Sequence, residues 1–182
     1  MTQPRLSFYL LFSFLLSLSI VSCSSSDDDT VSSTGTTGSS STLAFAGSWA
    51  GDWNNTTFSS TGPLTLTIVD NGDDTVDITV DLDGFVGGFV NPDPQTITAN
   101  VASDGTVSFS GNVETGTGIQ SQLDFTMTPA GALTITMPDI NLSGFGEFSA
   151  SGTLSSGTAD LTYSINFEPS GSANGTASAT KS

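Results

Sequence analysis

The feature of this chain that most restricts its fold is an alternation of apolar and polar residues that recurs after Leu43. Between Val76 and Leu82, for example, every second residue is apolar and the residues between them are Asp or Thr. Successive side chains of a β-strand point to opposite faces, so this period of two is typical of a strand with one buried and one solvated face. No segment shows the 3.6-residue period of an amphipathic helix, and we expect no substantial helix. The alternation predicts strands over residues 47–53, 64–68, 76–82, 97–101, 107–113, 119–127, 133–137, 148–154 and 159–167, with a last strand that contains Lys181.

Short segments rich in Asn, Asp, Gly and Pro separate the predicted strands, such as Asp70–Asp74 and Asn91–Pro94. These residues favour turns because Asn, Asp and Gly tolerate a positive φ and Pro restricts φ. Links this short join antiparallel neighbours, since parallel pairing needs a long crossover. We therefore predict an all-β fold, an antiparallel meander of about 8–10 strands that closes into a barrel and so removes its edges. A β-sandwich is the alternative.

The charge and the missing residue types exclude several classes of function. The chain has 18 Asp and Glu against 2 Lys and Arg, no His and one Cys, and its formal net charge is −16. Such an acidic chain does not bind nucleic acid through its phosphates. Without His and with a single Cys, it cannot build a Ser-His-Asp triad, a His/Cys zinc site or an internal disulfide. The polar faces of the strands carry Asp, Gln, Asn and Thr, which favours a soluble barrel with its apolar face inward over a membrane barrel.

The remaining titratable residues do not form a recognisable catalytic pattern. General acid–base catalysis most often uses His, and the three glutamates Glu114, Glu147 and Glu168 lie far apart in the sequence. We therefore expect no catalytic residue and no cofactor. One hairpin is crowded with carboxylates, but it lacks the spacing of an EF-hand, so we expect a solvated acidic surface and no metal site, with a weak Ca²⁺ site at its turn as the alternative. These aspartates are Asp70, Asp73, Asp74, Asp77, Asp81 and Asp83.

The N-terminus carries the pattern of a secretion signal. After Arg5, the apolar stretch Leu6–Ile20 is too short to span a membrane and has the length of a signal peptide core. It ends in Ile20-Val21-Ser22-Cys23, which resembles the lipobox of bacterial lipoproteins. The resemblance implies removal of residues 1–22 and attachment of a diacylglycerol and an N-acyl chain such as palmitate to Cys23. An uncleaved membrane anchor or a buried free thiol is the alternative.

The segment after the lipobox predicts a tether and a location. Residues 23–42 consist of Cys23 and a run of Ser, Thr, Gly and Asp that contains too little apolar surface to fold, so we expect a disordered linker. Ser24–Asp29 resembles the acidic motif that directs Bacteroidetes lipoproteins to the outer face of the outer membrane; a solvated charge run is the alternative. We expect a protein of the cell envelope, held to the outer membrane by lipid and exposed at the surface, with residues 43–182 as its one domain.

The start of the predicted domain resembles a known barrel family. Gly47-Ser48-Trp49 is similar to the Gly-x-Trp motif in the first strand of lipocalins, where a basic residue near the end of the last strand packs over the Trp. Lys181 is placed to do so. The resemblance implies a small antiparallel, calycin-like barrel that holds an apolar ligand in its mouth. The Thr-Asp-Tyr motif and the C-terminal helix of that family are absent from this chain.

Four aromatic residues are the candidate ligand-binding residues: Trp49, Trp53, Phe125 and Tyr163. Large aromatics are also the usual filling of a core, so packing is the alternative role for each of them. The sequence thus predicts a lipid-anchored binding protein that holds a small apolar or saccharide ligand in its barrel. A structural or adhesive surface lipoprotein with a filled core and no ligand is the alternative.

Overall fold

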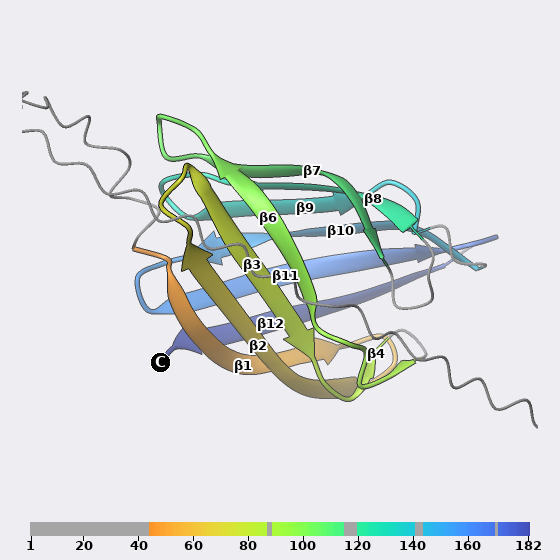
Figure 1. Cartoon of the computed structure of the whole chain (residues 1–182). Helices are drawn as coiled ribbons and strands as arrows, with labels where there is room; N and C mark the ends of the chain where they lie inside the picture. The colour runs from red at the N-terminus through yellow and green to blue at the C-terminus, as the bar shows by residue number, and fades with distance from the viewer. Residues whose placement is uncertain (1–43, 87–88, 115–119, 141–143, 170) are drawn as a thin grey trace, which may run out of the picture. The chain divides into compact units, whose positions relative to one another are not determined.

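The computed structural model describes residues 44–86, 89–114, 120–140, 144–169 and 171–182 (Figure 1). The predicted signal peptide, Cys23 and the tether up to residue 42 lie outside the described residues. The chain divides into two compact units, and the second, Thr36–Ser182, contains every described strand.

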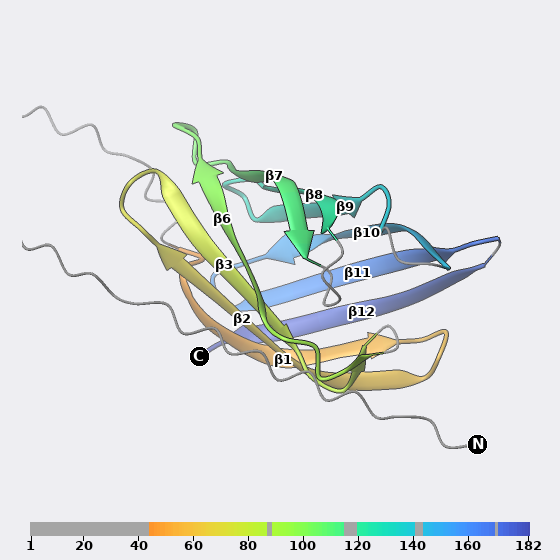
Figure 2. The same cartoon turned by 45° about the vertical axis from the view of Figure 1, so that its right-hand side comes forward.

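Ten strands form one closed antiparallel barrel in the order β1-β12-β11-β10-β9-β8-β7-β6-β3-β2 (Figures 1 and 2). The predicted all-β meander is confirmed, and the closed order excludes the sandwich. Within the described residues the structure contains no helix, and hence none long and apolar enough to cross a membrane. The strands of the barrel are β1 (Gly47–Asn55), β2 (Ser60–Asp70), β3 (Thr75–Leu82), β6 (Gln95–Val101), β7 (Val107–Glu114), β8 (Gln120–Met127), β9 (Ala132–Met137), β10 (Phe145–Leu154), β11 (Thr158–Phe167) and β12 (Ser172–Lys181).

A second, two-stranded sheet lies in the connection between β3 and β6 and was not predicted. It consists of β4 (Phe85–Val86) and β5 (Phe89–Val90), which are too short for an alternation to show in the sequence. Asn91 closes this hairpin onto Gly84: its backbone N–H donates to the Gly84 carbonyl at 2.8 Å, and its side-chain oxygen accepts from the Gly84 N–H at 2.7 Å.

The strand register places the apolar member of each alternation on the inside of the barrel. Leu66 of β2, for instance, lies opposite Val80 of β3 on one side and Trp49 of β1 on the other. Because every strand is paired on both sides, the inward residues form one continuous core within this unit. The buried apolar residues of that core are Phe45, Trp49, Trp53, Leu64, Ile68, Val76, Ile78, Ala99, Val107, Phe125, Met127, Leu133, Leu154, Ala159 and Ala179.

Inward-facing glycines allow the barrel to bend where neighbouring strands come closest. A Cβ atom on Gly152 of β10 would lie 2.0 Å from the carbonyl oxygen of Asp160 in β11. A Cβ on Gly51 of β1 would lie 1.9 Å from the carbonyl oxygen of Ser178 in β12. Contacts this short with a neighbouring backbone cannot be relieved by a side-chain rotation. These glycines therefore act in barrel closure, as glycine kinks do in curved sheets.

The two ends of the barrel differ in packing. We term proximal the end where β1 starts and β12 ends, and distal the opposite end, where β1 joins β2 and β11 joins β12. Four of the five largest fully buried side chains, Trp49, Met127, Val76 and Val107, belong to the proximal end, and the fifth, Ser121, lies at the distal start of β8. Inward-facing apolar side chains of the distal half, such as Phe148 and Ile165, are only half-buried. The proximal end is thus a packed plug, and the distal half is the more accessible part of the interior.

Candidate functional site

Trp49 fills the proximal end. Its side chain is 0% exposed, and its indole N–H donates to the carbonyl oxygen of Phe45 at 3.1 Å. Lys181 Nζ lies 5.7 Å from the centroid of the Trp49 ring and donates to the carbonyl oxygen of Ala44 at 2.9 Å. The packing of a basic residue over this Trp, which the lipocalin resemblance implies, is therefore present in the structure. This packing of Lys181 over Trp49 closes the proximal end of the barrel with a core side chain.

Trp53 and Phe125 are also largely buried inside the barrel. Trp53 is 4% exposed, and its indole N–H donates to the carbonyl oxygen of Asp83 at 2.8 Å, which ties β1 to the start of the connection that carries β4 and β5. Phe125 is 7% exposed and lies on β8 between Phe109 of β7 and Ile135 of β9. Each ring packs against the core and keeps little surface for contact with a ligand.

Tyr163 is the one of the four candidate aromatics that stays half-buried. Its ring lies directly over Gly175 of β12, where a Cβ would come within 2.3 Å of the ring, and its hydroxyl donates to the carbonyl oxygen of Asn54 at 3.2 Å. The Phe148 ring is 6.3 Å away, centroid to centroid. Burial raises the pKa of the Tyr163 phenol, so it stays protonated to a higher pH than a free tyrosine. Tyr163 thus offers a neutral hydroxyl within an aromatic part of the distal half.

Exposed apolar side chains gather on the connections of the distal end. Phe58 in the turn between β1 and β2 is 63% exposed, and Phe85 and Val90 of the small sheet are 59% and 74% exposed. The Phe167 ring at the end of β11 packs edge-on against Phe58 at 5.8 Å and against Phe145 at 5.2 Å. We term these five residues the distal rim. The sequence pattern did not reveal it, because these residues come together only when the turns of one end meet.

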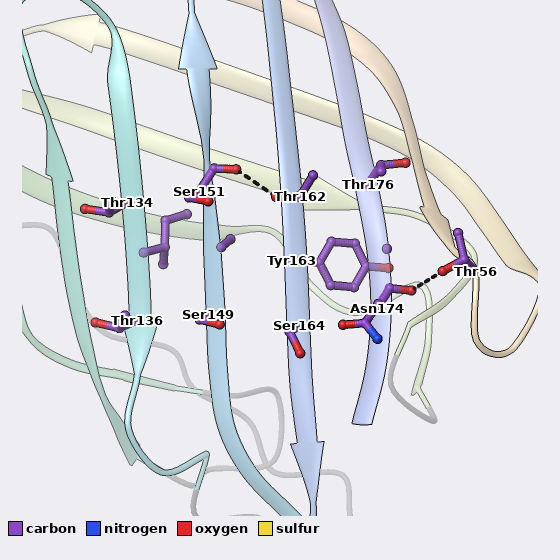
Figure 3. A pocket seen from close by; sticks show the side chains of 13 residues that line it. Thr56, Thr134, Thr136, Ser149, Ser151, Thr162, Tyr163, Ser164, Asn174 and Thr176 are labelled. Carbon is purple, nitrogen blue, oxygen red and sulfur yellow. Dashed lines mark hydrogen bonds between the residues drawn. The ribbon is translucent and has the colours of Figure 1, made fainter. Parts of the chain in front are cut away.

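An open depression of about 590 Å³ lies on the outer face of β9, β10, β11 and β12, and its exposed surface is more apolar than polar although Ser, Thr and Asn side chains line it (Figure 3). Outward-facing side chains line it in two rows that cross the four strands, and Thr56 lies beside it. The backbone at Ile135, Ala150, Tyr163 and Gly175 lies between the rows. The proximal row is Thr134, Ser151, Thr162 and Thr176, and the distal row is Thr136, Ser149, Ser164 and Asn174.

The acidic hairpin between β2 and β3 uses its carboxylates in local hydrogen bonds. Asp70 accepts from the Gly72 N–H at 2.8 Å, and Asp73 accepts from the Thr75 hydroxyl at 2.5 Å. Asp77 accepts from the Thr98 hydroxyl across the strands at 2.7 Å. Among the residues that the structure describes, no three acidic side chains come together in a group that could hold a metal ion. The hydrogen bonds fix the local geometry of the hairpin.

No model of a known protein family matches the chain, and no curated protein sequence matches it either. Among solved structures, the crystal structure of Rv2717c from M. tuberculosis is similar, with a TM-score of 0.52 and 10% sequence identity. The match covers 79% of this chain and 98% of that chain. At this identity the similarity concerns the fold alone, and it agrees with a lipocalin-like barrel in the general sense.

Proposed function

We propose that this protein is a lipid-anchored binding protein of a bacterial cell envelope that holds a small apolar ligand in the distal half of its barrel. The observation that carries the proposal is the incomplete burial of inward-facing apolar side chains within a closed barrel. Val80, Ile97, Phe148 and Ile165 all face inward in the distal half from different strands, and all are only half-buried. Side chains that filled the interior would bury one another.

The number of strands and the size of the inward residues support this proposal. Barrel diameter grows with strand number, and eight strands already enclose a space that side chains just fill. This barrel has ten strands. Along β12 the inward positions carry Ala173, Gly175, Ala177 and Ala179, so one whole wall has short side chains. A ten-stranded barrel in which the inward residues of β12 from Ala173 to Ala179 are only Gly and Ala is expected to leave room for a ligand in its interior.

The distal rim supports entry of an apolar molecule at this end. Ligand sites combine an apolar lining with a few polar groups that orient the ligand. The rim supplies exposed Phe58 and Phe85, and the hydroxyl of Tyr163, which donates to the carbonyl oxygen of Asn54, is a polar group in the same half of the barrel. Exposed apolar surface of this kind is otherwise unfavourable in water, and it often marks a contact site.

An open interior should be sensitive to a large side chain at position 177. Ala177 faces inward and is half-buried, so Ala177→Phe should occupy the space that a ligand needs. We expect the wild-type barrel to bind the neutral apolar dye N-phenyl-1-naphthylamine, and the variant to bind it at least about tenfold more weakly, a change of about 1.4 kcal/mol. Dye fluorescence and urea unfolding are measured on the same samples. The matched control is Ser178→Phe, which adds the same ring to the outer face of the same strand and should leave dye binding unchanged.

The free energy of unfolding of Ala177→Phe distinguishes an open interior from a filled one. Extra volume in a packed core costs about 1–3 kcal/mol, whereas a ring placed in open space costs little. If Ala177→Phe loses that much stability, or if the wild type does not bind the dye, the ligand proposal is wrong. A filled core would then favour the structural or adhesive alternative.

The second prediction concerns the lipid anchor at Cys23, which rests on the lipobox resemblance. Two or three acyl chains hold a protein stably on a membrane. Without any acyl chain, this acidic protein would have no membrane anchor. We expect the wild type in the outer-membrane fraction, accessible to added protease on intact cells, and Cys23→Ser in the soluble fraction. Ser24→Ala is the control and should fractionate as the wild type does. A Cys23→Ser variant that remains in the membrane fraction would overturn the lipoprotein assignment.

A further inference from the structure

We propose that the outer face of β9–β12 binds a neutral oligosaccharide in the depression between the proximal and distal rows (Figure 3). This site is separate from the barrel interior, because both rows occupy outward positions of the four strands. The rows cross three strand-to-strand intervals, which corresponds to a length of about 14 Å. That length suits a short chain of sugar rings lying across the strands.

The lining carries no charge, although the protein is strongly acidic. All the residues that line the depression are uncharged, whereas the formal net charge of the chain is −16. Carboxylates border the depression, Asp124 opposite Thr136 and Asp160 opposite Thr153, but neither belongs to its lining. The field of the protein repels anionic ligands, and a lining without carboxylates offers no binding group to a cation. A neutral ligand therefore fits best.

The hydroxyl groups of the rows are free to bind. In the described part of the chain, the side-chain hydroxyls of Thr134, Ser151 and Thr176 in the proximal row have no protein hydrogen bond, and neither do those of Thr136, Ser149 and Ser164 in the distal row. Each hydroxyl can both donate and accept, which matches the hydroxyl groups of a sugar.

Other outer faces of the barrel use their polar side chains differently. The hydroxyls of Thr79 and Thr96 bond to each other across β3 and β6 at 2.8 Å. On β7 and β8, Ser110 donates to Asp124 at 2.7 Å, and Gln122 donates to Ser110 at 3.1 Å. Outward side chains that satisfy one another have less to gain from a ligand. On β9–β12, by contrast, the unbonded hydroxyls lie in two adjacent rows around one depression.

The fold itself argues against a peptide as the occupant. An extended peptide usually binds a sheet by adding a strand at its edge. The barrel is closed, and every one of its strands is already paired on both sides. A protein partner would also require large apolar anchors, which the two rows do not contain.

The test uses the intact protein in micelles of lauryldimethylamine oxide, a detergent that carries no sugar. Binding to immobilised cellohexaose, xylohexaose and maltohexaose is measured, with hexagalacturonate as the charged comparator. We expect at least one neutral hexasaccharide to bind and hexagalacturonate not to bind. The triple variant Thr134→Val, Thr162→Val, Thr176→Val removes hydroxyls from the proximal row and keeps the side-chain shape. We expect it to bind at least about tenfold more weakly.

The matched control is Thr65→Val, Thr67→Val, Thr79→Val, which makes the same changes on the outer faces of β2 and β3, away from the depression, and should bind as the wild type does. Ala177→Phe in the interior should also leave sugar binding unchanged, which separates this site from the proposed apolar site. The inference is wrong if no neutral hexasaccharide binds, if hexagalacturonate binds equally well, or if both triple variants lose binding equally. Loss of sugar binding in Ala177→Phe with retention in the proximal-row variant would place the sugar inside the barrel and overturn it as well.

Discussion

Replacement of Gly152 by alanine is expected to destabilise the barrel by about 3 kcal/mol or more, beyond the usual cost of one added methyl group. The new Cβ would lie 2.0 Å from the carbonyl oxygen of Asp160 and 2.8 Å from the Cα of Leu161. Both atoms belong to the backbone of β11, so β10 and β11 would have to separate where they are paired. Urea unfolding of the barrel unit, followed by far-ultraviolet circular dichroism, measures the change.

Gly157 provides the matched control for Gly152→Ala. It lies in the turn between β10 and β11, and a Cβ there meets no atom within 4 Å. Alanine at this position restricts the unfolded chain without a clash, so we expect the free energy of unfolding to stay within about 1 kcal/mol of the wild type. Equal stability of Gly152→Ala and Gly157→Ala would show that the close approach of β10 and β11 is not needed for closure.

Trp49→Ala is the second large effect that we expect, a loss of about 3–5 kcal/mol in the free energy of unfolding. The side chain is 0% exposed and fills the proximal end beneath Lys181. Its removal leaves a cavity that the strands cannot fill by moving together, because the barrel is closed. Its loss also frees the buried carbonyl oxygen of Phe45 from its indole partner. The midpoint of urea unfolding should fall while its slope stays the same, because the surface exposed on unfolding changes little.

Trp49→Phe separates the volume of the ring from its hydrogen bond. Phenylalanine keeps most of the apolar contact and loses the N–H group, so a smaller loss than for alanine is expected. Dye binding in the distal half should be retained in Trp49→Phe, since Trp49 lies at the opposite end from the proposed site. A loss of dye binding without a loss of stability would instead make Trp49 part of the ligand site.

The candidate site could be predicted only in part. The sequence identified Trp49, Trp53, Phe125 and Tyr163 as inward-facing aromatics, and the strand register confirms that direction for all four. It could not separate the plug from the accessible half, because alternation specifies a face and not a level along the barrel. Trp49 and Tyr163 have the same pattern in sequence, yet one is fully buried and the other is half-buried.

The distal rim and the outer depression could not be predicted from the sequence for a related reason. Phe58 and Phe167 are far apart along the chain and meet because the turn after β1 lies beside the end of β11. The free hydroxyls of β9–β12 form rows only in the observed register of four strands. Pairwise register depends on packing and turn geometry together, which no single strand specifies.

The sequence by itself determined the strands, their inward faces and the antiparallel meander, because a period of two and short turns are local properties that few other folds satisfy. Its lack of His also excluded a Ser-His-Asp triad built from these residues. Only the tertiary structure decided that ten strands close into one barrel, that the proximal end is packed, and that glycines such as Gly152 permit closure. These properties depend on the distance between backbones that are remote in sequence, and closure of the whole sheet sets that distance.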